Sequence, residues 1–105
     1  MRQKAGIWEI LAKKEMGLIN AAKAGNESVV ENLIKENTDI NCRDEYKQTP
    51  LMWAVAIENK GIVQHLLKHG ADVNYRDENG DTALTIAKNF GHNEIANVLK
   101  QAGAK

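Results

Sequence analysis

The sequence repeats itself with a period of 33 residues, and this period constrains the fold more than any other feature of the chain. At this offset, residues 44–71 align with residues 77–104 without a gap, and nine aligned pairs are identical. The pairs are Asp44/Asp77, Glu45/Glu78, Thr49/Thr82, Leu51/Leu84, Ala54/Ala87, Ile62/Ile95, Leu66/Leu99, Gly70/Gly103 and Ala71/Ala104. Self-similarity at this spacing is typical of folds that stack copies of one small unit, each contacting its neighbours.

Each unit predicts two short helices joined by turns. In the middle unit, Thr49 can cap a helix that begins at Pro50, because a Thr hydroxyl accepts a helix-start N–H and Pro suits the first helical position. A second helix is expected over residues 60–68, where apolar residues recur at helical spacing. Gly70 favours a left-handed helix end. The fold class predicted is all-α, a solenoid of helix-turn-helix units with short β-hairpin or turn connections.

These residues resemble the ankyrin repeat, whose signature is Thr-Pro-Leu-His-x-Ala. The matching segment here is Thr49-Pro50-Leu51-Met52-Trp53-Ala54, and Gly70-Ala71-Asp72-Val73-Asn74 is similar to the family's hairpin signature. The resemblance covers residues 16–105 and implies one domain over residues 1–105. Its predicted parts are an N-terminal capping helix (1–15), repeat 1 (16–43), repeat 2 (44–76) and repeat 3 (77–105).

Two turn positions depart from the pattern that the resemblance implies. Lys47 stands where a turn Gly is expected, and Glu58 replaces the Gly between the two helices of the middle unit. A residue with a side chain is strained where the backbone must adopt a positive φ. We therefore expect less rigid turns at these two positions.

The N-terminal segment is apolar on one side and is expected to be helical over about residues 5–15. Its apolar residues are Ile7, Trp8, Ile10 and Leu11. The favoured interpretation is a helix that caps the first unit, or one long helix that runs to Ala24, because an exposed apolar cluster is a liability in a monomer. The alternative is an apolar surface for a partner or for a second copy of the chain.

The charge balance argues against two classes of partner. The 14 basic and 14 acidic residues cancel, whereas nucleic acids and anionic membranes attract strongly basic surfaces. A single cysteine allows no internal disulfide, and no apolar run is long enough to span a membrane. With no signal-peptide core near the N-terminus, the predicted location is the cytoplasm, or the host cytoplasm for a secreted effector.

No set of residues predicts catalysis, a metal site or a cofactor. His65 and His69 share one helix face at metal-ligand spacing, but no third ligand lies near them in the sequence. Cys42 lies in the hairpin segment beside Arg43, which is expected to lower its pKa somewhat, yet no base accompanies it. Trp8 and Trp53 are interpreted as packing residues. We therefore predict that the chain is not an enzyme.

The resemblance implies a protein-protein interaction module that binds a partner protein through its hairpin tips and the concave face of the first helices. The expected partner-binding residues are Arg43, Glu45, Tyr46, Gln48, Met52, Ala56, Ile57, Arg76, Glu78, Asn79, Asp81, Asn89 and Phe90, with Lys23 and Ala24 from the first unit.

Within this set, Tyr46 is an expected anchor, and Arg43 and Arg76 are expected to grip partner carboxylates. Ile57 and Phe90 either form one apolar strip or cover the adjacent turns. The partner is expected to be another protein, which the module serves as an adaptor, effector or inhibitor. The alternative function is a scaffold that self-associates through the N-terminal apolar helix, although a monomer is favoured over a homodimer.

Overall fold

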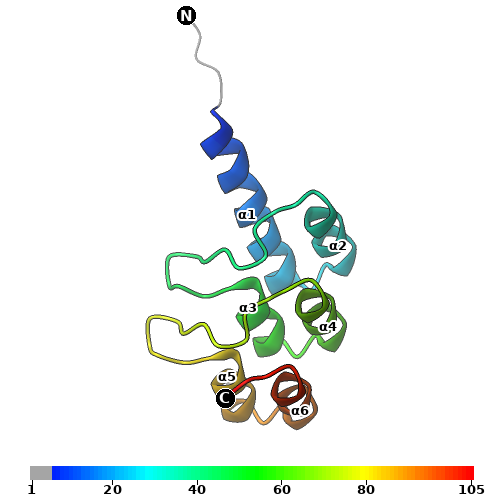
Figure 1. Cartoon of the computed structure of the whole chain (residues 1–105), viewed down its shortest axis with the longest axis vertical. Helices are drawn as coiled ribbons and strands as arrows, with labels where there is room; N and C mark the ends of the chain where they lie inside the picture. Colours follow the sequence, from blue (N-terminus) through cyan, green and yellow to red (C-terminus); the bar gives the residue numbers. More distant parts are fainter. Residues whose placement is uncertain (1–5) are drawn as a thin grey trace, which may run out of the picture.

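Three pairs of helices stack along the long axis of the molecule in the computed structural model, which describes residues 6–105 (Figure 1). One row contains α1 (Ile7–Ala24), α3 (Pro50–Ala56) and α5 (Ala83–Asn89), and the other contains α2 (Glu27–Lys35), α4 (Lys60–Lys68) and α6 (Asn93–Gln101). Helix α3 contacts α1, α4 and α5, so the middle pair links the other two. The molecule measures 54 × 28 × 21 Å.

The starts of α3 and α5, 33 residues apart, have the same capping chemistry. Thr49 Oγ1 accepts a hydrogen bond from the N–H of Met52 at 3.2 Å, and Thr82 Oγ1 accepts one from the N–H of Thr85 at the same distance. Asn59 caps α4 in the same way, at 3.0 Å from the N–H of Ile62. Each such cap stabilises the fold by ~1 kcal/mol.

The interior repeats with the same period. Leu18, Leu51 and Leu84 are 0%, 1% and 5% exposed, so they occupy equivalent interior positions in successive units. Ala54 and Ala87 are fully buried where neighbouring helices meet. A larger side chain at such a position would overpack the contact between helices. The shared faces of consecutive helix pairs therefore form one continuous core.

Two long loops project side by side from the row of α1, α3 and α5 (Figure 1). We call them finger 1 (residues 36–49) and finger 2 (residues 69–82). Of the predicted β-hairpin or turn connections, turns are the ones observed, since no residue within 6–105 lies in a strand. Positive φ angles recur in these turns and between paired helices. They are found at Gly25, Glu58 and Gly91, at Asn37, Gly70 and Gly103, and at Lys47 and Gly80.

The N-terminal segment differs from the predicted cap. Its residues from Ile7 onward form the first half of α1, an unbroken helix of 18 residues that extends beyond the stack (Figure 1). Trp8 is 79% exposed and Ile7 is 62% exposed, so this half of α1 does not cover the first unit. The alternative of one long helix to Ala24 is the one observed, because no turn interrupts the helix at Gly17. Residues 1–5 of the predicted cap lie outside the described residues.

The positive φ at Lys47 generates a stability prediction. Lys47 (φ 62°) and Gly80 (φ 82°) occupy the same turn position in fingers 1 and 2. A non-Gly residue in the left-handed region costs ~1–2 kcal/mol, and Gly loses ~0.5–1 kcal/mol more backbone entropy on folding. We expect Lys47→Gly to raise the free energy of unfolding by up to ~1 kcal/mol, measured by urea denaturation.

The matched variant is Gly80→Lys, which should lower the free energy of unfolding by about the same amount. A decrease in Lys47→Gly would contradict the assignment of strain to this turn.

Candidate functional site

The finger side of the molecule carries two hollows, one repeat apart. The hollow between repeats 2 and 3 has a volume of about 250 Å³, and the hollow between repeats 1 and 2 has a volume of about 240 Å³. The first is lined by Gln48, Trp53, Ala56, Asp81, Ile86, Asn89 and Phe90. The second is lined by Met16, Ile19, Asn20, Lys23, Asp44, Glu45 and Tyr46. Both lie between a finger and the row of α1, α3 and α5, and they share two repeat-equivalent pairs of lining residues, Asn20/Trp53 and Lys23/Ala56.

An aspartate fixes the tip of each finger. Asp44 Oδ1 accepts hydrogen bonds from the N–H groups of Tyr46 and Gln48, both at 2.9 Å. Its second oxygen accepts a bond from Trp53 Nε1 at 2.9 Å, which ties finger 1 to α3. Asp77, 33 residues later, accepts the equivalent N–H bonds in finger 2. These local bonds order the tips before any partner arrives.

Contacts between the fingers add to this order. Gln48 Nε2 donates to Asp77 Oδ2 at 3.2 Å, and the Arg43 guanidinium donates to the carbonyl of Arg76. The Arg43 guanidinium also lies 4.9 Å from the Tyr75 ring. Arg76 Nη1 donates to the carbonyl of Gly80 at 2.9 Å. Both arginines therefore brace the fingers, which leaves fewer donors for the carboxylate grip predicted from the sequence.

Most of the sequence-predicted residues are accessible at this surface, but Met52 is not. Met52 is 1% exposed and belongs to the core, so its prediction as a partner-binding residue is wrong. The position equivalent to it in repeat 1, Ile19, is only 3% exposed. The position that holds the His of the family signature therefore faces the core in this chain. The accessible members of the set are Arg43, Glu45, Tyr46, Gln48, Ala56, Ile57, Arg76, Glu78, Asn79, Asp81, Asn89 and Phe90.

The exposed apolar residues have different surroundings. Tyr46 and Phe90 are 51% and 60% exposed, and each lines one hollow. Ile57 is 41% exposed, and its Cδ1 atom approaches the turn at Gly25, 3.6 Å from where a Cβ would stand. This contact favours the interpretation that Ile57 covers a turn. Phe90 instead stacks obliquely with the His92 ring at 5.7 Å.

Trp53 lines the hollow between repeats 2 and 3, although it was interpreted from the sequence as a packing residue. Its ring is half-buried, and Lys23 Nζ lies 4.6 Å from the ring centre. Lys23 in turn lines the neighbouring hollow, so the cation-π contact between Lys23 and Trp53 joins the two hollows. The sequence signal for Trp53 was that it occupies the variable position (x) of the Thr-Pro-Leu-His-x-Ala signature.

The electrostatics of the finger tip keep Tyr46 protonated. A hydrogen bond with the Glu45 carboxylate, together with the negative charge of that group, raises the pKa of Tyr46 above its usual value. Glu78 and Asp44 add to the effect with their charges. The phenol therefore remains a neutral hydrogen-bonding group at the tip of finger 1.

The two histidines singled out in the sequence do not converge. His69 Nδ1 lies 2.8 Å from the backbone carbonyl of His65, in the last turn of α4. His65 Nε2 faces α2 instead, 2.8 Å from Glu31 Oε2 and 3.4 Å from Glu27 Oε2. Sequence spacing did not reveal these glutamates, because they belong to the preceding unit.

Cys42 is a buried thiol, which is 5% exposed. Burial and the negative charges of Glu15 and Asp39 raise the pKa of Cys42 to about 12. The expectation that Arg43 lowers this pKa is wrong, because the Arg43 guanidinium is bonded to the fingers. The Cys42 Sγ donates to the Glu15 carbonyl at 3.7 Å, which suits a structural role.

The raised pKa generates a prediction about alkylation by iodoacetamide. Only the thiolate reacts, and folding shifts its formation from near pH 9.0 to about pH 12. The rate for urea-unfolded protein should rise up to about pH 9 and then level off. The rate for native protein should stay low throughout this range, as followed by mass spectrometry. Fast native alkylation at pH 8 would contradict the buried, protonated state.

Two comparisons bear on the identity of the chain. The family model described as ankyrin repeats (3 copies) matches residues 18–105, which include α2 to α6 and the last part of α1. A search of curated proteins found no match. Within residues 6–105, no helix combines the length and the apolar character needed to cross a membrane. Because the family match covers most of the sequence and coincides with the stacked helix pairs, the chain belongs to the ankyrin repeat family.

Proposed function

We propose that the chain binds a partner protein on its finger side, through the finger tips and the concave face of the first helices. Ankyrin repeats are generally protein-protein interaction modules, and the family is typically non-enzymatic. The proposed role is that of an adaptor, effector or inhibitor that acts by occupying a partner's surface. We place this role in the cytoplasm, where a single reduced thiol is ordinary.

The observation that carries this proposal is the pair of hollows on the finger side, each lined by an exposed aromatic side chain. Tyr46 stands at one hollow, and Phe90 at the other beside half-buried Trp53. Aromatic residues in or near pockets are frequent energetic centres of protein interfaces. Around them lie acidic and amide groups, such as Asp81 and Asn89, that can orient a partner by hydrogen bonds.

Preorganisation supports the same surface. The bonds of Asp44 and Asp77 hold each finger tip through the backbone, and Gln48 links the two fingers. A surface ordered in the unbound state loses little conformational entropy on binding. The entropy cost of ordering the loops therefore offsets little of the free energy gained from the aromatic contacts.

A pull-down from the source cells tests this surface. A variant with Tyr46→Ala and Phe90→Ala should lose the partner, because truncating one interface centre typically costs ≥2 kcal/mol, or ~30-fold in affinity. Its circular dichroism and melting temperature should stay close to those of the wild type, since both side chains are exposed.

The matched control carries Gln64→Ala and Asn97→Ala, which are exposed on α4 and α6 in the other row of helices. This control should retain the partner. Retention by the finger-side variant, or equal loss in both variants, would remove the surface assignment.

A second candidate function is self-association through the projecting half of α1. Five apolar side chains on or near this half are exposed, which is an unusual density for one helix end. They are Ile7 (62%), Trp8 (79%), Ile10 (44%), Leu11 (38%) and Met16 (54%). In this alternative the chain is a scaffold, and its α1 helices pair between two copies.

Light scattering with size-exclusion chromatography separates the two candidates. For a scaffold, the wild type should show a dimer mass that increases with concentration, and Trp8→Glu with Leu11→Glu should restore the monomer, because both charges would be buried between the helices. A matched variant, Lys13→Glu, changes an exposed residue on the other face of the same helix and should leave the dimer mass unchanged. A wild type that is monomeric at all concentrations removes the scaffold and leaves the binding module.

A further inference from the structure

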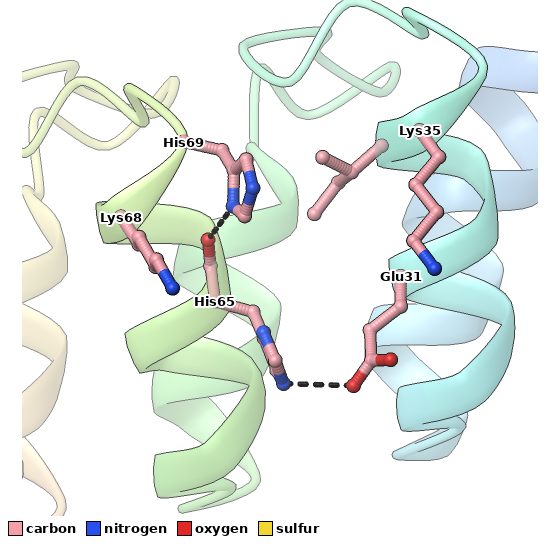
Figure 2. Close-up of a pocket in the computed structure, with 6 residues that line it drawn as sticks. Glu31, Lys35, His65, Lys68 and His69 are labelled. Carbon is pink, nitrogen blue, oxygen red and sulfur yellow. Dashed lines mark hydrogen bonds and ion pairs between the residues drawn. The ribbon is translucent and has the colours of Figure 1, made fainter.

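Three potential metal ligands from consecutive repeats converge on the side of the molecule away from the fingers. Glu27 and Glu31 lie one helical turn apart on α2, and His65 faces them from α4. Their ligand atoms all lie within 4.8 Å of one another. Figure 2 shows His65 and Glu31 directed toward each other across the gap between the two helices.

The three ligand atoms lie close enough for one small cation to bind after a small rearrangement. His65 Nε2 lies 2.8 Å from Glu31 Oε2 and 3.4 Å from Glu27 Oε2. A tetrahedral ion with bonds of ~2.0–2.2 Å holds its ligand atoms ~3.3–3.6 Å apart. Side-chain rotations that lengthen the His65–Glu31 distance from 2.8 Å to ~3.3 Å would place the three atoms around one ion.

The packing of the two helices leaves room for this arrangement. A Cβ atom at Gly61 would lie 2.5 Å from Glu27 Oε2, so any larger residue there would displace the carboxylate. Gly61 is in α4 and has no positive φ that would require glycine. Its lack of a side chain is what lets the Glu27 carboxylate rest against α4, within reach of His65.

The cluster brings two like charges together, with lysine side chains nearby. Two carboxylates four residues apart on a helix repel each other, and one imidazole neutralises at most one of them. Lys35 and Lys68 line the adjacent hollows. Within residues 6–105, however, no lysine or arginine forms an ion pair with Glu27 or Glu31. A divalent cation held by the three ligand atoms would relieve the repulsion between the two carboxylates.

We propose that Glu27, Glu31 and His65 form a zinc site that joins repeat 1 to repeat 2. Imidazole nitrogen and carboxylate oxygen are both ordinary zinc ligands, and the mixed set disfavours calcium and magnesium, which take oxygen ligands. The hollows on either side, with volumes of about 150 and 210 Å³, admit the water that completes the coordination. Because the ion bridges α2 and α4, zinc stabilises the contact between these repeats and leaves the finger side accessible.

Calorimetric titration of the full chain with zinc chloride, in a buffer that does not chelate zinc, tests the site. One equivalent should bind, and the melting temperature should rise with zinc concentration, because the ion binds only the folded arrangement. Magnesium chloride should produce neither effect. Absence of binding, or binding that does not raise the melting temperature, would overturn the proposal.

Four variants locate the ion. His65→Gln and Glu31→Gln should each weaken zinc binding by at least ~10-fold, because each removes one of three protein ligands. Gly61→Ala should also weaken it by displacing Glu27, while circular dichroism shows that the helices persist. His69→Gln is the matched control, since His69 lines the same hollow but its Nδ1 contacts the backbone of α4.

The zinc affinities of these variants, taken together, show whether the ion binds at the cluster or at another group. Unchanged affinity in His65→Gln and Glu31→Gln, or a loss confined to His69→Gln, would show an adventitious ion at another group. If His65→Gln unfolds, Glu31→Gln and Gly61→Ala give independent readings of the same site.

Discussion

The burial of shared apolar faces between consecutive helix pairs is the constraint on which the rest of the structure depends. A single pair of short helices cannot bury its own apolar side, so each unit needs a neighbour. Leu18, Leu51 and Leu84 meet this need in turn, and small alanines let the helices approach closely. The residues that make one surface different from another lie outside this repeated core.

The finger side shows how the repeat becomes a binding surface. Stacking brings finger 1 beside finger 2, and this proximity allows Gln48 to bond Asp77 and Arg43 to bond the backbone at Arg76. Neither contact exists within one unit. The rigidity of the proposed interface is therefore a property of the stack, although the residues that provide it are already visible in each repeat.

The opposite side shows that stacking can also create chemistry that no single unit contains. Glu27 and Glu31 come from repeat 1 and His65 from repeat 2, so their meeting depends on the contact between α2 and α4. Gly61 matters for the same reason, because it sets how closely the carboxylate approaches the second helix. A zinc ion at this cluster and a partner on the fingers would occupy separate faces of one stack.

The sequence by itself determined the fold class, the helix-turn-helix unit and the turns that need a positive φ. These features follow from local spacing, and the positive φ angles at Lys47 and Glu58 appear at the two positions where glycine was expected. The sequence also predicted most of the accessible finger residues. It misjudged Met52, because exposure depends on how a neighbouring unit packs rather than on a motif.

Only the tertiary structure decided how the N-terminal segment sits and which histidine meets which acid. Helix α1 is continuous and leaves Trp8 exposed, since helical spacing is the same whether an apolar stripe finds a partner or not. His65 and His69 are only four residues apart, yet His65 faces α2 and His69 contacts the backbone of α4. Such pairings depend on side-chain direction and helix packing across repeats, which a one-dimensional pattern does not encode.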